Sequence, residues 1–343
     1  MRRRTFLKGV AASALLHERA QADEIADFYR GKTISCYIGY ASGGGYDLYA
    51  RTISRYMQKH LPGNPVIVPI NMPGASSMIL GNHLAKVTPR DGTAFGIVNS
   101  ALLFDPLFNG SRSKAQFKGP DMTMVGNAVV SASVLIALSK SGVTSLEELR
   151  TKELLIASST PSGDTYLLPL AMKNVLGLKL KIITGYPGTR EVALALENGE
   201  VFGRVWDMEG IKAARPQWLQ DGTIRILAQL APKPDRAVPA GVPLAKELAR
   251  SEDDKKVLDV IFLSTILARP FVAPPNLPPA RAKALQDAFW ASLHDPDFKA
   301  EMEKLQLTID PISGVDMERL VSEAYALPQP LIDKVRKALT TEG

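Results

Sequence analysis

Hydrophobic positions follow two different periods along the chain, and the period changes every ten to twenty residues. Residues 33–39 form a short run rich in β-forming side chains, which is followed by a glycine-rich segment. Apolar residues then recur at three- and four-residue spacings from Tyr46 to Met57. Short runs favour strands and the longer spacing favours a helix with one apolar face. This block therefore predicts a strand, a loop and a helix.

The same alternation continues as far as residue 229. We predict further strands at 66–70, 93–98, 134–138, 154–157, 180–183, 201–206 and 225–229. The helices between them are expected near 76–85, from a capping box at Thr144, up to Gly177, up to Gly199, and near 209–220. Strands that alternate with helices predict α/β lobes, each with a mainly parallel sheet covered by helices.

The pattern changes after Ala231, where four prolines mark a linker. The later segments read as helices at 278–294, 315–326 and 329–340. We found no short-period repeat. The pattern thus predicts two α/β lobes and a helical tail that packs back on one of them.

Charge raises the question of a nucleic-acid or membrane partner. The 343 residues contain 41 Lys and Arg against 35 Asp and Glu, a net charge of +6, with 45% hydrophobic and 22% charged residues. That composition is typical of a globular protein and excludes disorder as a description of the whole chain. The single cysteine, Cys36, excludes an internal disulfide and a cysteine-rich metal site.

Four of the six net positive charges lie in the first 22 residues. A basic start is followed by a mostly apolar stretch at 9–16 and by the small-x-small pattern Ala20 to Ala22, as in an export signal. The segment from Arg3 to Lys8 is similar to the twin-arginine motif. The alternative is a basic N-terminal tail of a cytoplasmic protein.

Cleavage after Ala22 would remove five basic residues and one acidic residue, leaving 36 positive and 34 negative charges, a net of +2. The remaining basic residues are interspersed with acids, so no basic stripe for nucleic acid remains. No run of about 18 apolar residues is long enough to span a bilayer. We therefore predict an exported protein.

Two glycine loops, each between a predicted strand and a predicted helix, are the candidate binding elements. A helix start carries unpaired backbone N–H groups and a partial positive charge, and glycine lets an anion approach them closely. Loops after adjacent parallel strands open at the same sheet edge. The pair therefore predicts a small carboxylate held largely by backbone donors. Its residues are Ser42, Gly43, Gly44, Gly45, Tyr46 and Asp47 in the first loop, and Asn71, Pro73, Gly74, Ala75, Ser76 and Ser77 in the second.

Similar loops in the second lobe are expected to face them across a cleft. The candidates are Ser162, Gly163, Asp164, Tyr186 and Asp207. The alternative is that these are ordinary turns without a ligand. Asp47 also has two interpretations, since it either caps its helix or recognises an amino group or a bridging water.

Known catalytic motifs do not fit these loops. Gly43-x-Gly45 continues to Leu48 where a dinucleotide fingerprint requires glycine or alanine. No nucleophile elbow is present, and none of the three histidines after the signal forms a metal-binding or catalytic motif; they are His60, His83 and His294. We therefore predict no catalysis, no cofactor and no metal site.

Several of these segments together resemble the Bug-type receptors of tripartite tricarboxylate transporters. The similarity is carried by Tyr40 to Arg51 (YASGGGYDLYAR) and by the segment from Asn71 to Ala75. It is supported by the segments Leu61 to Pro65 and Pro89 to Thr93. This chain departs from the family at Ser76 and Ser77, where Gly-Gly is usual.

The resemblance implies a type II periplasmic-binding fold of two lobes with a ligand cleft between them and the helical C-terminal tail on lobe one. Lobe one would comprise residues 23–127 plus 230–343, and lobe two 128–229, with the export signal at 1–22. The two glycine loops would hold the ligand's proximal carboxylate, and Asp47 would contact any amino group.

The expected function is that of a monomeric periplasmic receptor that delivers an organic carboxylate to membrane permease subunits. The carboxylate would be a di- or tricarboxylate or an aromatic acid. One alternative is a ligand sensor for a two-component system. Another is a two-lobed enzyme, for which only Asp47, Asp164 and Asp207 are candidate bases.

Overall fold

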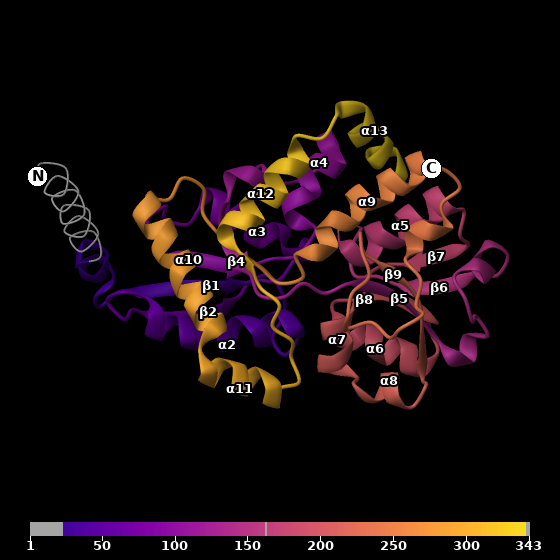
Figure 1. Cartoon of the computed structure of the whole chain (residues 1–343), viewed down its shortest axis with the longest axis horizontal. Coiled ribbons are helices and arrows are strands. Elements are labelled where there is room, and N and C mark those ends of the chain that lie inside the picture. Colours follow the sequence, from indigo (N-terminus) through magenta and orange to yellow (C-terminus); the bar gives the residue numbers. More distant parts are fainter. Residues whose placement is uncertain (1–22, 162, 341–343) are drawn as a thin grey trace, which may run out of the picture.

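Two separate sheets organise the chain. The computed structural model describes residues 23–161 and 163–340. One sheet has the strand order β11-β4-β10-β3-β1-β2, and the other has the order β7-β6-β8-β5-β9. They form the left and right halves of the molecule in Figure 1, which we call lobe one and lobe two. The α/β class and the two lobes predicted from the sequence are confirmed.

Each sheet combines three parallel strands with antiparallel ones. In lobe one, β1 pairs in parallel with β2 and β3, while β10 lies antiparallel between β3 and β4. In lobe two, β6 pairs in parallel with β7 and β8, while β5 is antiparallel to β8 and β9. The strands of lobe one are β1 (Thr33–Ile38), β2 (Val66–Asn71), β3 (Ala94–Ile97), β4 (Thr123–Asn127), β10 (Pro270–Ala273) and β11 (Ile312–Ser313). Those of lobe two are β5 (Ser133–Leu138), β6 (Leu154–Ala157), β7 (Leu180–Ile183), β8 (Gly203–Asp207) and β9 (Ile224–Leu230). The expectation of mainly parallel sheets was therefore only half right.

Helices cover the sheets as the apolar spacing predicts. The helix α2 has a first-turn acid, last-turn basic residues and a face of buried residues that includes Tyr49 and Ile53. The helices α5 and α6 end before Gly177 and Gly199, both with positive φ as expected of a C-terminal glycine cap. The helices of lobe one are α2 (Gly45–His60), α3 (Met78–Lys86), α4 (Asp105–Asn109), α10 (Pro279–His294), α11 (Pro296–Lys304) and α12 (Gly314–Tyr325). Lobe two has α5 (Asp164–Leu176), α6 (Thr189–Asn198), α7 (Met208–Ala214), α8 (Gln217–Gln220) and α9 (Glu252–Ile266).

Two predicted helices differ in the structure. The segment 209–220 is divided into α7 and α8, because Pro216 disfavours a helical conformation for Arg215, whose φ is −148°. The predicted capping box at Thr144 opens only a short 3₁₀ helix, Glu147–Arg150. There Glu148 accepts from the Thr144 backbone and hydroxyl, one residue later than the expected partner.

The return of the chain to lobe one comes later than the sequence indicated. The segment 231–267 continues along lobe two: Gln229 N donates to Pro243 O, Arg150 donates to Leu248 O, and α9 packs on α5. The predicted change of lobe at residue 230 is therefore wrong. The chain leaves lobe one after β4 and returns at 267–269, directly before β10.

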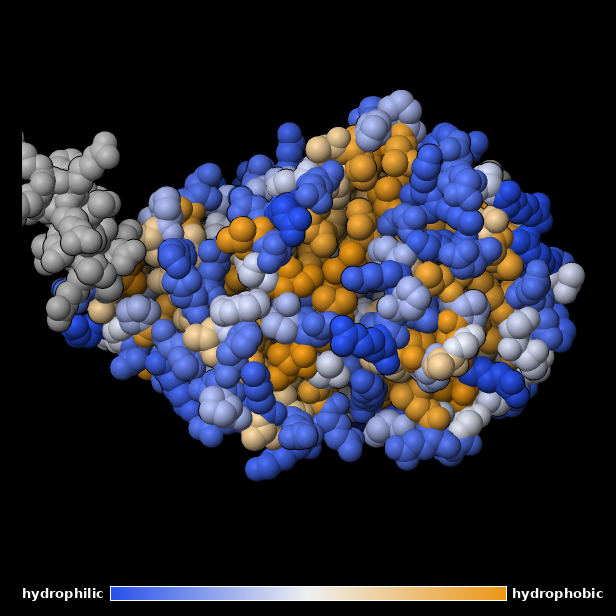
Figure 2. All heavy atoms as spheres, viewed as in Figure 1, coloured by the Kyte–Doolittle hydropathy of each residue, from blue (hydrophilic) through white to orange (hydrophobic). Residues whose placement is uncertain are grey.

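The last helix, α13 (Gln329–Ala338), spans both lobes. It packs against α4 of lobe one and against α5 and α9 of lobe two. Figure 1 shows it at the top of the molecule, above the junction. In the view of Figure 2, apolar residues are exposed over the middle of the molecule beside α9 and α12. Of the tail, α10 and α12 pack on lobe one, whereas α13 joins the two lobes.

Candidate ligand-binding site between the lobes

The first glycine loop is held in place by Asp47. The loop connects β1 to α2, and Gly44 stands at the N-terminal cap position of the helix. Asp47 Oδ2 accepts from Gly43 N at 3.0 Å, and its Oδ1 accepts from Arg51 Nε at 2.9 Å and from Asn71 Nδ2 at 2.8 Å. Asp47 therefore links the first loop to the start of the second.

These three donors also set the protonation of Asp47. Burial raises its pKa, but the bonds from Arg51, Gly43 and Asn71 outweigh that effect and leave the pKa below its ordinary value. Asp47 is therefore an anion that already accepts three hydrogen bonds. Its backbone partner is Gly43, which precedes the cap residue Gly44, so Asp47 secures the loop and makes no cap bond to α2. Contact with a ligand amino group stays a prediction.

The second loop adopts a left-handed backbone over consecutive residues. Gly74 has a φ of 138°, and Ala75, Ser76 and Ser77 have φ of 46°, 51° and 69°. Non-glycine residues pay about 1–2 kcal/mol for this conformation. The serines therefore occupy a backbone that glycine would adopt without strain.

The hydroxyl group of Ser77 makes hydrogen bonds that offset the cost of this backbone conformation. The side chain is fully buried, donates to Gly39 O at 3.2 Å and accepts from Asn99 N at 3.1 Å. A Cβ at Gly39 would lie 2.2 Å from Ser77 Oγ, so only glycine fits at position 39. Ser77 thus joins the C-terminal ends of β1 and β3 at the same sheet edge.

The second loop contacts lobe two directly. Ser76 Oγ and Thr160 Oγ1 lie 2.6 Å apart. A Cβ built at Gly163 would lie 2.4 Å from Ser76 Oγ, so the lobe-two loop packs closely against the serine. Ser162, predicted from the sequence to bind ligand, lies outside the described residues. The Asn71–Ser77 loop and the β6–α5 loop therefore meet across the boundary.

Asp164 makes a second contact across the boundary. Its Oδ1 accepts from Asn99 Nδ2 at 3.2 Å, and its Oδ2 accepts from Ser100 Oγ at 3.3 Å. Burial raises the pKa of Asp164; the Asn99 bond lowers it, and the charge of Asp207 raises it further, so the net shift is upward. A carboxyl group from lobe two thus accepts hydrogen bonds from two residues that follow β3 of lobe one.

Asp207 makes a third contact, with an arginine next to the crossover. Asp207 caps α7 by accepting from Gly210 N at 2.8 Å, and the same oxygen accepts from Arg269 Nη2 at 2.9 Å. Arg269 is 1% exposed, and its guanidinium lies 4.4 Å from the ring centre of Tyr46. Burial lowers the pKa of Arg269, but the charge of Asp207 outweighs this and the net shift is upward. Tyr46 in turn stacks on Tyr40 at 4.3 Å.

Arg204 is a further buried cation beside these groups. It lies on β8, is 4% exposed, and stacks on Trp206 at 3.8 Å. Burial lowers the pKa of Arg204 to about 10, against the charges of Asp207 and Asp164. Arg204 therefore stays protonated near neutral pH.

Tyr186 takes no part in the contacts described so far. It is partly buried against the apolar cluster of lobe two that contains Val192 and Trp206, and burial raises its pKa. Its predicted contact with a ligand stays a prediction. The same holds for Pro73, which is exposed in the second loop.

Five residues that the loop argument did not select join the site. They are Tyr40, Asn99, Ser100, Arg204 and Arg269. Asn99 and Ser100 directly follow a predicted strand, so the strand-end rule used for the other loops would have found them. Arg204 offered another signal, a charged residue within an apolar strand. Arg269 gave none, because its neighbours at the boundary come from distant segments.

The remaining reactive groups lie elsewhere. His60 pairs with Asp295 at 3.0 Å, and His294 bonds to the Trp290 carbonyl at 2.8 Å. Cys36 is buried in β1, which raises the pKa of its thiol to about 12. Across residues 23–161 and 163–340, no three His, Cys, Asp or Glu side chains cluster as metal ligands.

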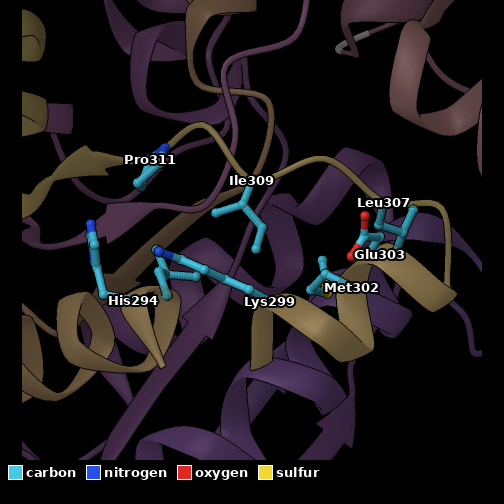
Figure 3. Close-up of a pocket in the computed structure, with 8 residues that line it drawn as sticks. His294, Lys299, Met302, Glu303, Leu307, Ile309 and Pro311 are labelled. Carbon is cyan, nitrogen blue, oxygen red and sulfur yellow. The ribbon is translucent and has the colours of Figure 1, made fainter. Parts of the chain in front are cut away.

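A separate hollow of about 430 Å³ lies on the outside of lobe one. Figure 3 shows it between the end of α10, α11 and the segment that leads to β11. None of the predicted ligand-binding residues lines it. Its lining residues are Leu293, His294, Lys299, Met302, Glu303, Leu307, Ile309 and Pro311.

Comparison with known proteins agrees with this architecture. MatC from Rhodopseudomonas palustris with bound malate has a TM-score of 0.67 at 19% identity, covering 90% of this chain and 99% of that one. The periplasmic binding protein BugD has a TM-score of 0.69 at 18% identity, covering 90% and 98%. Rpa4515 of R. palustris with adipate has a TM-score of 0.66 at 21% identity, covering 90% and 97%. No curated protein sequence gives a significant match.

The two lobes and the two crossovers between them define the two-lobed fold of periplasmic binding proteins. Residues 49–336 match the model of the tripartite tricarboxylate transporter family receptor. The chain therefore belongs to that family, as its glycine loops indicated. No described helix is long and apolar enough to cross a membrane.

Proposed function

We propose that this protein is a periplasmic receptor that captures a small organic carboxylate and delivers it to the membrane subunits of a tripartite transporter. The ligand would bind between the lobes, with one carboxylate on the two glycine loops. The receptor would work without a cofactor and without turnover of its ligand.

The observation that supports this proposal best is the meeting of both loops at the lobe boundary. Asp47 and Asn71 join the first loop to the second, and Ser76 of the second loop reaches Thr160 of lobe two. The helix α2 begins at Gly45, directly behind the first loop, so its backbone donors and its dipole are available to an anion there. Related structures that contain malate and adipate support a carboxylate as the ligand class.

A ligand screen tests the proposal directly. Purified mature protein would be titrated with mono-, di- and tricarboxylates and aromatic acids, and melting temperature and calorimetric heat would be recorded. At about 100 times Kd, a ligand adds roughly 2.7 kcal/mol to the free energy of unfolding. The proposal would be contradicted if no carboxylate bound at millimolar concentration while a cationic compound did bind.

Gly44 offers a sharper test of the backbone-donor claim. Its φ is −96°, and a Cβ placed there has no atom within 4 Å, so Gly44→Leu should fold normally. The bulky side chain should nevertheless abolish carboxylate binding, because it would block close approach to the loop. Ser322→Leu, an exposed position on α12, is the matched control and should bind as the wild type does. Retained affinity in Gly44→Leu would show that the loop is not the anion site.

The biological role and the export route need separate experiments. Deletion of the gene should block uptake of the ligand; loss of gene induction with normal uptake would instead identify a sensor. Mass spectrometry of ligand incubated with the protein should show no product, and turnover would favour an enzyme. N-terminal sequencing of the periplasmic protein should begin at Asp23 if the twin-arginine signal is cleaved after Ala22.

A further inference from the structure

Two buried arginines at the lobe boundary carry donors that the described part of the chain leaves unpaired. These donors are Nη1 of Arg204 and Nε of Arg269. Both residues are at least nine-tenths buried, with exposures of 4% and 1%. Burying a charged donor without an acceptor is costly. The pair therefore has the properties expected of a site that receives an acceptor from outside the chain.

An aromatic ring lies against each guanidinium group. Arg204 lies 3.8 Å from the ring centre of Trp206, and Arg269 lies 4.4 Å from that of Tyr46. When a ring covers the face of a guanidinium, its N–H groups point outward in the plane. That edge matches the two oxygens of a carboxylate.

Within the described residues, Arg269 pairs with a carboxylate from the opposite lobe. Its Nη2 bonds to Asp207 Oδ1 at 2.9 Å, across the boundary. Asp207 also accepts from Gly210 N at 2.8 Å within lobe two, so it keeps a partner of its own if the lobes separate. The Arg269–Asp207 pair is thus a contact that opening of the lobes would break and another carboxylate could replace.

Arg269 also adjoins the first glycine loop. A Cβ built on Gly45, the first residue of α2, would lie 3.0 Å from Arg269 Nη2. An anion on the loop and an anion on Arg269 would therefore be neighbours. Two carboxylates of one small ligand fit this arrangement better than two separate ions, since they are already joined.

We propose that Arg204 and Arg269 form a second anion site, at which the distal carboxylate of a dicarboxylate ligand replaces Asp207. The proximal carboxylate occupies the glycine loops. This inference rests on the proposed receptor function and narrows its ligand class to dicarboxylates, with a short linker between the two acid groups.

The test compares acids that differ only in the distal group. Succinate would be paired with butyrate, and adipate with hexanoate, by calorimetry on wild type and variants. Arg204→Gln should weaken succinate binding by about 10- to 100-fold, the range for hydrogen bonds to charged groups, and leave butyrate within about threefold. Arg215→Gln is the matched control. It also lies in lobe two beside a tryptophan, Trp218, but pairs with the half-exposed Glu197 and should change neither affinity.

A second variant acts in the opposite direction and does not depend on removing a buried cation. Asp207→Asn keeps a side-chain oxygen for the α7 cap but removes the competing charge. It should tighten succinate binding by about 10-fold and leave butyrate unchanged, with normal circular dichroism. Equal ratios of succinate to butyrate affinity in wild type, Arg204→Gln and Asp207→Asn would overturn the arginine site.

The failures of the two proposals are distinguishable. Wild-type protein that binds butyrate and succinate equally would retain the receptor function and lose the second anion site. Wild-type protein that binds no carboxylate would refute both. Tighter adipate than succinate binding, with the variant effects intact, would keep the site but contradict the short linker.

Discussion

At the scale of single residues, the second loop shows how one departure from a family pattern is accommodated. Ser76 and Ser77 stand where the sequence resemblance led us to expect glycines, yet both have positive φ. Ser77 recovers stability through two buried hydrogen bonds, while Ser76 makes its bond to the opposite lobe. Strain in the loop is therefore balanced by contacts that glycine cannot make.

Replacing Ser77 should expose this balance. Ser77→Ala keeps the strained backbone and leaves Gly39 O and Asn99 N without their partner, so it should lower the free energy of unfolding by about 1–3 kcal/mol. Ser76→Gly loses one bond but relieves strain, and should change it by less than about 1 kcal/mol. Urea unfolding measures both. Equal effects of the two substitutions would contradict this account.

Asp164 and Asp47 should respond to pH in opposite ways. The pKa of Asp164 is raised on folding, so its contribution to stability is full below its unfolded pKa, about 4, and is lost as pH rises through the folded pKa. Asp164→Asn should therefore melt higher than wild type at pH 7, with the gain shrinking toward acid. Burial is the largest cause of this raised pKa, the Asn99 and Ser100 bonds lower the pKa, and the charge of Asp207 raises it.

Asp47 provides the contrasting variant. Folding lowers the pKa of Asp47, so its contribution to stability is full above the pKa of the unfolded state. That contribution is lost as pH falls through the pKa of the folded state. Asp47→Asn should melt lower than wild type at pH 7, with the loss shrinking toward acid. Melting curves from pH 3.5 to 7.5, a range around the reference pKa of about 4, decide both cases. Parallel pH profiles for the two variants would refute the assigned shifts.

At the scale of elements, α13 is the helix whose packing joins the lobes. Ile332 and Val335 are buried, Arg336 donates to Leu107 O of α4, and Asn174 of α5 donates to Ala338 O. Ile332→Ala should therefore lower the free energy of unfolding by about 2–5 kcal/mol through a cavity in this shared contact. Lys337→Ala, exposed on the same helix, should change it by less than about 0.5 kcal/mol. Similar denaturant midpoints for both variants would show that α13 is dispensable.

The elements also show what local sequence patterns predict and what they miss. The strand-loop-helix blocks around Gly43 and Gly74 were predictable, because apolar period and glycine position are local properties. The strand β10 was missed since Pro270 opens it and its partners, β3 and β4, are distant in sequence. The assignment of 231–267 failed for the same reason, because prolines mark a linker without saying on which lobe it lies.

The same limit applies to the candidate site. The loop residues were found because a helix start after glycines is a local pattern, and Asp47 was found with them. Arg269 was missed because its function depends on Tyr46 and Asp207, which are far away along the chain. Composition could not reveal it either, since a count of charges does not show which of them are buried.

At the scale of the whole molecule, the lobes are joined by two kinds of contact. On one side α13 contributes apolar packing. At the lobe boundary around the glycine loops, here called the cleft side, the contacts are polar: Ser76 with Thr160, Asp164 with Asn99, and Asp207 with Arg269. When a polar contact breaks, water replaces its hydrogen bonds, so the net free-energy cost is small. Breaking apolar packing exposes apolar surface to water and costs more free energy. The cleft side is therefore the side expected to open for ligand, with the crossovers at 128–132 and 267–269 as hinges.

A disulfide across the cleft tests this opening. Ser76 Oγ and Thr160 Oγ1 lie 2.6 Å apart, so Ser76→Cys with Thr160→Cys places two thiols within bonding reach. Cys36 is buried and its thiol pKa is raised to about 12, so it should not compete. If ligand leaves by separation of the lobes, oxidation should slow its release by about tenfold or more, and reduction should restore it. Either single cysteine variant is the control, and release at the wild-type rate from the oxidised double variant would show that the cleft does not open at this contact.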